Sequence, residues 1–275
     1  MRISAAVISV VLLSGCTSTL TKVESPIQID RFAGVKGCFL LFNMKTNKFD
    51  KVIGDEATCK ERNSASSTFK VPLAVMAFDS GVLKDENVVL KWDGKKDVRE
   101  ESNKDHNAKT WMSQSIVWFS QRITPKLGQK KLQKYLNDFD YGNKDLSAGI
   151  TQAWLQSPSD KSALKISAYE QTEFMKKLWT DSLPASKRAM KITRDITFLE
   201  ASPKGYSLNG KTGSNFYDKE RKVRLGWFIS HLQKGDEEYI AVTTFSDIAP
   251  SNSTQYGGMR AKEITKEILG DLGLW

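Results

Sequence analysis

Histidine is scarce in this chain, and its scarcity narrows the chemistry that the protein can perform. The 275 residues include two histidines, His106 and His231, which lie far apart in sequence and have no metal-ligand spacing around them. A metal site is therefore not expected. A Ser-His-Asp triad is equally disfavoured, and the Gly-x-Ser-x-Gly turn of many serine hydrolases is absent.

Long apolar runs are also lacking, and a mean hydropathy of -0.41 excludes a protein that crosses the membrane many times. The apolar stretch from Ile3 to Leu13 is too short to span a bilayer. Because it follows Met1-Arg2 and ends at Leu13-Ser14-Gly15-Cys16, residues 1–16 resemble a bacterial lipoprotein signal. That resemblance implies cleavage before Cys16 and lipidation of its thiol; a plain secretory signal is the alternative. Either signal predicts export, and we expect a periplasmic protein, lipid-anchored to a membrane of a Gram-negative bacterium.

Cysteine is rare, with three residues in all. In an exported protein, Cys38 and Cys59 would lie in an oxidising compartment, where disulfides persist. They could bond to each other or remain two small buried thiols. The sequence does not decide between these two states, because it does not give the distance between their Cα atoms.

Positive charge is abundant, with a formal net charge of +9. The lysines are scattered and sit beside acids, as in Lys84-Asp85-Glu86, which is typical of solvated helix faces and turns. We therefore expect no nucleic-acid partner, although a basic surface favours anionic ligands.

Apolar patterning predicts strands at both ends of the chain and helices between them. Strands are predicted over residues 37–42, 48–53, 206–208, 224–232 and 239–245, and helices over 67–81, 111–123, 126–139, 167–180, 185–196 and 260–272. This order implies an α+β fold: a central antiparallel sheet flanked by helices, an α/β/α sandwich, with a mostly helical lobe inserted. After the signal we expect a single catalytic unit over 17–275, with a sheet lobe at about 20–66 and 203–275 and a helical lobe at about 67–202.

Three short motifs suggest chemistry. Ser67 and Lys70 lie three residues apart at the start of a predicted helix, so that the lysine amine can reach the serine hydroxyl. An N-capping serine followed by a surface lysine has the same spacing. Lys211-Thr212-Gly213 ends a predicted strand, where a cation, a hydroxyl and a bare backbone suit a carboxylate ligand. Between them, Ser115 on a predicted helix could pass a proton between Lys211 and a leaving nitrogen.

Taken together, these motifs make the sequence resemble the class D serine β-lactamases, the oxacillinases, from about Gly37 to Leu272. The matching segments are Ser67-Thr68-Phe69-Lys70, Ser115-Ile116-Val117, Tyr141-Gly142-Asn143, Ala153-Trp154-Leu155, Lys211-Thr212-Gly213 and Gly226-Trp227. Ser-x-Val in place of Ser-Asp-Asn separates the chain from class A enzymes. The resemblance implies a DD-peptidase/β-lactamase-like fold and hydrolysis of β-lactam antibiotics through an acyl-serine intermediate, which confers resistance.

The resemblance also implies roles for individual residues. Ser67 is the nucleophile, and Lys70 is the general base as N6-carboxylysine, formed with CO2 or bicarbonate, without a metal. Val117 and Leu155 would keep the lysine dry, and the Trp154 indole would donate a hydrogen bond to the carbamate. The remaining assignments are backbone N–H groups of Ser67 and Ser214 for the oxyanion, the substrate-binding residues Lys211, Thr212, Gly213 and Arg260, and Tyr141 and Asn143 in a supporting turn.

Two other functions remain open. A penicillin-binding protein or penicillin-sensing domain shares the serine and lysine motifs but deacylates extremely slowly. A structural lipoprotein with an inactive hydrolase fold would not react with penicillin at all. The substrate spectrum depends on loops such as 92–106 and 215–223, whose conformations the sequence does not give, and the oligomeric state is likewise open.

Overall fold

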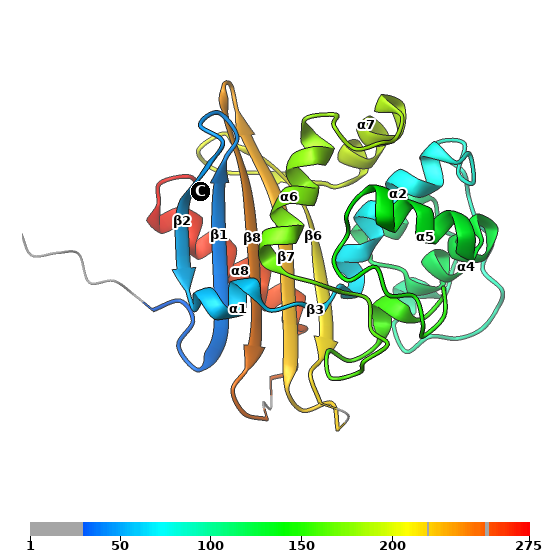
Figure 1. Cartoon of the computed structure of the whole chain (residues 1–275), viewed down its shortest axis with the longest axis horizontal. Helices are drawn as coiled ribbons and strands as arrows, with labels where there is room; N and C mark the ends of the chain where they lie inside the picture. Colours follow the sequence, from blue (N-terminus) through cyan, green and yellow to red (C-terminus); the bar gives the residue numbers. More distant parts are fainter. Residues whose placement is uncertain (1–29, 219, 251–252) are drawn as a thin grey trace, which may run out of the picture. The chain divides into compact units, whose positions relative to one another are not determined.

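An antiparallel sheet organises the computed structural model, which describes residues 30–218, 220–250 and 253–275. Within these residues the main sheet has six strands in the order β2-β1-β8-β7-β6-β5 (Figure 1). The strands are β1 Val35–Asn43, β2 Lys48–Gly54, β5 Phe198–Ala201, β6 Ser207–Phe216, β7 Arg224–Lys234 and β8 Glu237–Asp247. Both ends of the chain supply strands, which confirms the predicted α+β fold. The predicted signal at 1–16, with Cys16, lies outside the described residues.

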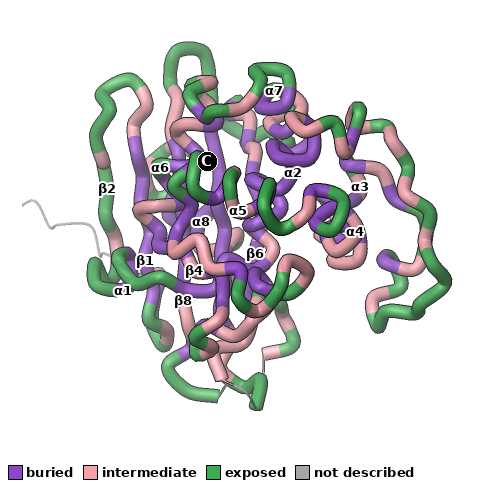
Figure 2. Tube along the Cα trace, turned by 45° about the vertical axis from the view of Figure 1, so that its right-hand side comes forward, coloured by how far each residue is buried: buried purple, intermediate pink, exposed green. Residues whose placement is uncertain are grey.

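The alternation of side chains along β1 shows how the sheet is covered on both faces. Phe39 and Leu41 point into a core cluster with Ile268 of α8, whereas Leu40 joins a second cluster with Phe174 of α6. In Figure 1, α6 (Ala168–Trp179) lies in front of the sheet and α8 (Gly257–Asp271) behind it. Burial of both faces explains why β1 has a continuous apolar run rather than an alternating one (Figure 2).

The other helices lie around this core, most of them on the side of the molecule beyond β6, whereas α1 packs against β1 (Figure 1). They are α1 Glu56–Lys60, α2 Lys70–Asp79, α3 Ala108–Ser113, α4 Val117–Leu127, α5 Gln129–Asp138 and α7 Lys187–Ile196, with 3-10 turns η1 Ser66–Phe69, η2 Glu100–Ser102 and η3 Ala153–Leu155; a small second sheet pairs β3 Asn63–Ser64 with β4 Lys165–Ile166. Residues Arg31–Trp275 form one compact unit. Among the described residues, no helix has the length and apolar character needed to cross a membrane.

Two predicted elements differ from the structure near the motifs. The helix predicted over 111–123 is broken into α3 and α4, because Ser115 has a φ of 57° and left-handed backbone cannot continue a helix. Ser115 therefore lies in a turn, not on a helix. The strand predicted over 206–208 continues to Phe216, so that Lys211-Thr212-Gly213 lies inside β6 rather than at its end. Pairing with β7 over this whole length stabilises a segment whose polar and glycine residues hide the strand pattern.

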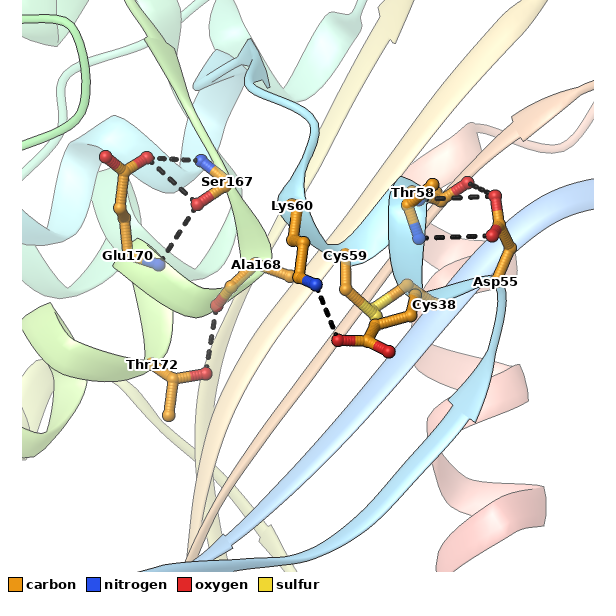
Figure 3. Close-up of a disulfide and its surroundings, with 11 residues drawn as sticks. Cys38, Asp55, Thr58, Cys59, Lys60, Ser167, Ala168, Glu170 and Thr172 are labelled. Atoms are coloured by element: carbon orange, nitrogen blue, oxygen red, sulfur yellow. Dashed lines mark hydrogen bonds and ion pairs between the residues drawn. A yellow bond between two sulfur atoms is a disulfide. The ribbon is translucent and has the colours of Figure 1, made fainter.

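A disulfide joins β1 to α1, which resolves the question that the sequence left open. Cys38 and Cys59 are bonded and fully buried (Figure 3). Asp55 caps α1 by accepting hydrogen bonds from the backbone N–H groups of Ala57 and Thr58. The cap and the disulfide together fix a five-residue helix that is too short to be stable alone.

Candidate functional site

Ser67 lies at the edge of a cleft of ≈ 450 Å³. It belongs to η1, whose neighbours Ser66, Thr68 and Phe69 are buried, whereas Ser67 is partly exposed. Among the described residues the cleft is lined by Ser67, Val98, Arg99, Glu101, Ser113, Gln114, Ser115, Val117, Thr212, Ser214, Tyr256 and Met259. The rigid turn therefore presents a hydroxyl to a space that can hold a small molecule.

Lys70 begins α2 directly below Ser67. Its Nζ donates a hydrogen bond to Ser67 Oγ at 3.2 Å, and its side chain is 1 % exposed. Burial holds the pKa of Lys70 well below its usual value of 10.5, and the positive charges of Lys211 and Arg99 lower it further. A neutral amine beside a serine hydroxyl can accept its proton, which is the arrangement that activates a nucleophile.

Ser115 reaches the cleft from the turn between α3 and α4. Its left-handed φ of 57° turns the chain away from the axis of α3 and lets Ile116 act as the N-cap residue of α4. Ser115 and Val117 consequently both line the cleft, one with a hydroxyl and the other with an apolar surface. The sequence motif is thus brought to the site by a turn.

Lys211 faces the site from β6. It is 4 % exposed, and its Nζ donates to the carbonyl oxygen of Thr212 at 2.8 Å. Burial, and secondarily the charge of Arg99, lower its pKa to about 7. Thr212 and Ser214 line the cleft, while Lys211 lies just beneath its surface. A lysine with this pKa can both donate and accept a proton near neutral pH.

Two glycines allow three elements to meet at the cleft. A Cβ on Gly213 would lie 3.0 Å from Thr68 Cγ2, and one on Gly258 would lie 2.7 Å from the carbonyl oxygen of Gly213. Bare backbone at both positions lets η1 and the first turn of α8 pack directly on β6. The N–H of Gly258 also donates to Ser214 Oγ at 2.9 Å. The positions of the nucleophile and of Ser214 are thereby fixed relative to each other.

Trp154 is fully buried in η3, and its ring stacks on Phe69 with centroids 5.2 Å apart. Within the described part of the chain, its Nε1–H has no hydrogen-bond partner. An unsatisfied buried N–H is costly, so an acceptor at this point would be strongly favoured. Phe69 directly precedes Lys70, so that Trp154 packs against the residue next to the lysine.

Several predicted site residues lie away from the cleft. Arg260 Nη1 donates to Asp247 Oδ1 at 2.7 Å, its guanidinium lies over Phe245, and it does not line the cleft. Tyr141 is buried in the core, and the Asn143 side chain donates to and accepts from the backbone at residues 163 and 165. The expected turn role of these two is therefore visible, but direct substrate contact is not. Leu155 follows Trp154, and its carbonyl oxygen accepts from the Asn215 amide.

The structure also adds residues that the motifs did not suggest. Arg99 and Glu101 enter the cleft from the loop before α3, and Tyr256 and Met259 from the start of α8. Tyr256 and Met259 are about half exposed, and with Val98, which is 97 % exposed, they form an apolar rim. No spacing in the sequence marks these positions, because they depend on where an irregular loop and a helix end pack.

Comparison with known proteins identifies a family and individual relatives that this chain resembles. Residues 37–270 match the family described as Penicillin binding protein transpeptidase domain. The chain is 36 % identical over 278 residues to beta-lactamase OXA-1 of Escherichia coli, covering 97 % of this chain and 94 % of that protein.

Solved structures with the same fold include class D β-lactamases and a penicillin receptor domain. The structure of class D beta-lactamase BAT-2 superposes with a TM-score of 0.78 at 33 % identity, covering 89 % of this chain and 94 % of the other. The C-terminal domain of the Bacillus licheniformis BlaR penicillin-receptor superposes with a TM-score of 0.80 at 28 % identity, with the same two coverages.

Proposed function

Because this chain belongs to the class D β-lactamases, within the wider penicillin-binding transpeptidase family, we propose that it hydrolyses β-lactams through an acyl-enzyme formed on Ser67. It is a hydrolase of the cyclic amide bond, and this serine chemistry needs no metal. The observation that carries the proposal is the 3.2 Å contact between Ser67 Oγ and the Nζ of a fully buried Lys70.

Acylation follows from the groups around the cleft. The general base at Lys70 accepts the proton of Ser67 as Oγ attacks the lactam carbonyl carbon. The developing oxyanion accepts hydrogen bonds from the backbone N–H groups of Ser67 and Ser214, and loss of one such donor typically costs about 3 kcal/mol. Lys211 supplies a proton through the Ser115 hydroxyl to the lactam nitrogen as the C–N bond breaks. Thr212 and Lys211 hold the substrate carboxylate.

We further propose that Lys70 is carboxylated on Nζ. Only a neutral amine adds CO2, and burial keeps Lys70 neutral. The unpartnered Nε1–H of Trp154 is a donor suited to the added carboxylate. When bound, the group supplies a base that can activate water for deacylation.

Carboxylation can be tested with labelled bicarbonate. A carbamate signal in 13C NMR is expected for the native protein and not for Lys70→Ala. Trp154→Phe should weaken the signal and slow deacylation more than acylation. Absence of the signal at saturating bicarbonate, with native turnover, would refute the carbamate.

A penicillin-sensing role is the second candidate, favoured by the similarity to the BlaR receptor domain. Such a domain forms the same acyl-serine but keeps it. Purified protein mixed with a chromogenic cephalosporin separates the two functions: continuous hydrolysis supports the enzyme, whereas one equivalent of product per protein supports the sensor. Ser67→Ala should abolish both reactions.

For localisation, we propose export and lipid anchoring at Cys16 in the periplasm. The Cys38–Cys59 disulfide supports an oxidising compartment. Expressed in a Gram-negative host, the native chain should fractionate with membranes, and Cys16→Ser should be soluble or retained as precursor. Membrane association of processed Cys16→Ser equal to that of the native chain would exclude the lipid anchor.

A further inference from the structure

Arg99 makes an arrangement of hydrogen bonds that the mechanism above does not use. Its Nη1 donates to the carbonyl oxygen of Gln114 at 3.2 Å, and its Nη2 to that of Ser115 at 3.3 Å. Nη2 also donates to Ser102 Oγ at 3.0 Å. One guanidinium therefore bridges η2 and two successive carbonyl groups in the turn that carries Ser115.

This turn needs external support because of its backbone conformation. Left-handed backbone costs a non-glycine residue about 1 kcal/mol or more, and Ser115 adopts it with a φ of 57°. Hydrogen bonds within the turn come from the N–H groups of Gln114 and Ile116, which donate to Thr110 and Trp111. The carbonyl side of the same turn is held by Arg99.

Arg99 is better suited to hold protein than to bind substrate. Within the described residues, three of its N–H groups already donate to protein oxygens, and 22 % of its side chain is exposed. Glu101 Oε1 lies 3.8 Å from Arg99 Nη1, and Asp97 Oδ1 lies 4.0 Å from Arg99 Nε. These two carboxylates balance part of the charge of Arg99. The planar fork of arginine matches two adjacent carbonyl oxygens, which a lysine ammonium cannot bridge in the same way.

We propose that Arg99 is a positioning residue of the active site, which keeps the Ser115 hydroxyl in the cleft by fixing the carbonyl groups of the α3–α4 turn. The inference rests on the proposed function, because Ser115 matters only if it transfers a proton. It also explains why this cation lies in a cleft without being free for a ligand.

The test compares Arg99→Met with Arg122→Met. Arg122 anchors the same 91–106 loop by donating to the carbonyl oxygen of Lys91 and pairing with Asp93, and it does not line the cleft. Arg99→Met should lower the acylation rate constant by about 10-fold to 100-fold, the usual effect of a displaced catalytic group. Arg122→Met should leave it within about twofold, and Arg99→Lys should fall between, since a lysine can hold one carbonyl.

A double-mutant cycle shows whether the effect passes through Ser115. At a pH well above the acid limb of the pH–rate profile, Arg99→Met should cause little further loss in the Ser115→Ala background. Arg99→Met removes a positive charge and should also raise the pKa of Lys70 and Lys211, which moves the acid limb of the pH–rate profile to higher pH. Arg99→Lys keeps the charge and should leave the acid limb in place. Glu101 and Asp97, which also face Arg99, are present in both variants. Besides burial, Arg99 also lowers the pKa of His106, so that loss of the cation should raise this pKa as well.

Hydrogen exchange of the peptide spanning residues 110–118 gives a readout independent of activity. Exchange should be faster in Arg99→Met and unchanged in Arg122→Met. Unchanged exchange, or an equal loss of rate in the native and Ser115→Ala backgrounds, would overturn the inference. If the native protein does not react with β-lactams at all, the proposed function fails, while the exchange result still decides what Arg99 does to the turn.

Discussion

Ionisable groups in and beside the sheet are of two kinds: those with a partner of opposite charge and those without one. On β7, His231 Nε2 lies 2.7 Å from Glu238 Oε1 of β8. At the other end of β8, Asp247 Oδ1 lies 2.7 Å from Arg260 Nη1 of α8. On β6, Lys211 is only two residues from Asn209, the register partner of His231. Yet among the described residues no carboxylate forms an ion pair with Lys211 or Lys70.

The contrast teaches that pairing, rather than burial, distinguishes the site. A charged group removed from water is stabilised by a partner, and burial without one lowers the pKa of both lysines. The hollow beside His231 has a volume of ≈ 760 Å³ and is larger than the cleft at Ser67. Its ionisable groups are paired: His231 with Glu238, Arg194 with Asp181, and Asp195 with Lys191. The hydroxyl of Ser207 at its wall donates to the carbonyl oxygen of Gln233 rather than to a base.

The largest effect is expected where a lone lysine is removed. Lys70→Met should lower turnover at least about 1000-fold, because the serine loses its base. The free energy of unfolding should stay equal or rise, since an apolar side chain replaces a desolvated amine of similar size. Steady-state kinetics and denaturant unfolding measure both quantities, with the exposed Lys45→Met as control. A marked loss of stability would break the comparison.

Removal of one member of an ion pair should instead lower stability strongly and turnover only slightly. Asp247→Ala leaves the part-buried Arg260 without its partner and should lower the free energy of unfolding by about 2 kcal/mol, the value of a hydrogen bond to a charged group, with a much smaller loss of turnover than Lys70→Met. The double variant with Arg260→Met should recover part of the stability. If Arg260→Met alone raises the KM for carboxylate-bearing β-lactams strongly, then Arg260 binds substrate after all.

A smaller effect concerns the pH dependence of binding. Lys211, with a pKa lowered to about 7, is cationic at pH 6 and largely neutral at pH 9. The KM for a carboxylate-bearing β-lactam should therefore rise by about tenfold across this range, the approximate value of one charge-assisted hydrogen bond. Lys211→Gln should have a high KM that does not vary with pH. A flat native profile would show that Lys211 does not contact the carboxylate as a cation.

The smallest effect is expected at His231. Burial lowers its pKa in the folded state although Glu238 opposes the shift, so the unfolded chain binds more protons as the pH falls. Stability should consequently decrease as the pH drops through about 6.5, the unperturbed value of histidine. His231→Gln should flatten this part of the stability profile without changing hydrolysis. A native profile equal to that of the variant would show that His231 contributes nothing to it.

Features of the fold and of the site can be predicted from the sequence where the residues that form them lie close together along the chain. The strands β1 and β2, the helix α6 and the Ser67–Lys70 contact each involve residues close in sequence, whose patterns and spacing the sequence displays. The strand β5 and the short helix α1 were not predicted, since each has few residues and depends on its neighbours. The break at Ser115 was missed because it has no glycine or proline to mark it.

The sequence by itself indicated the family through the motifs that it shares with it, the antiparallel α+β fold through the periodicity of its apolar residues, and the Ser67–Lys70 contact through a spacing of three residues. Only the tertiary structure decided that Cys38 reaches Cys59, that Arg260 turns toward Asp247, and that Arg99 holds the Ser115 turn. Each of these contacts joins side chains from separate elements. Their partners are selected by packing and by the cost of leaving a buried charge or polar group unpaired.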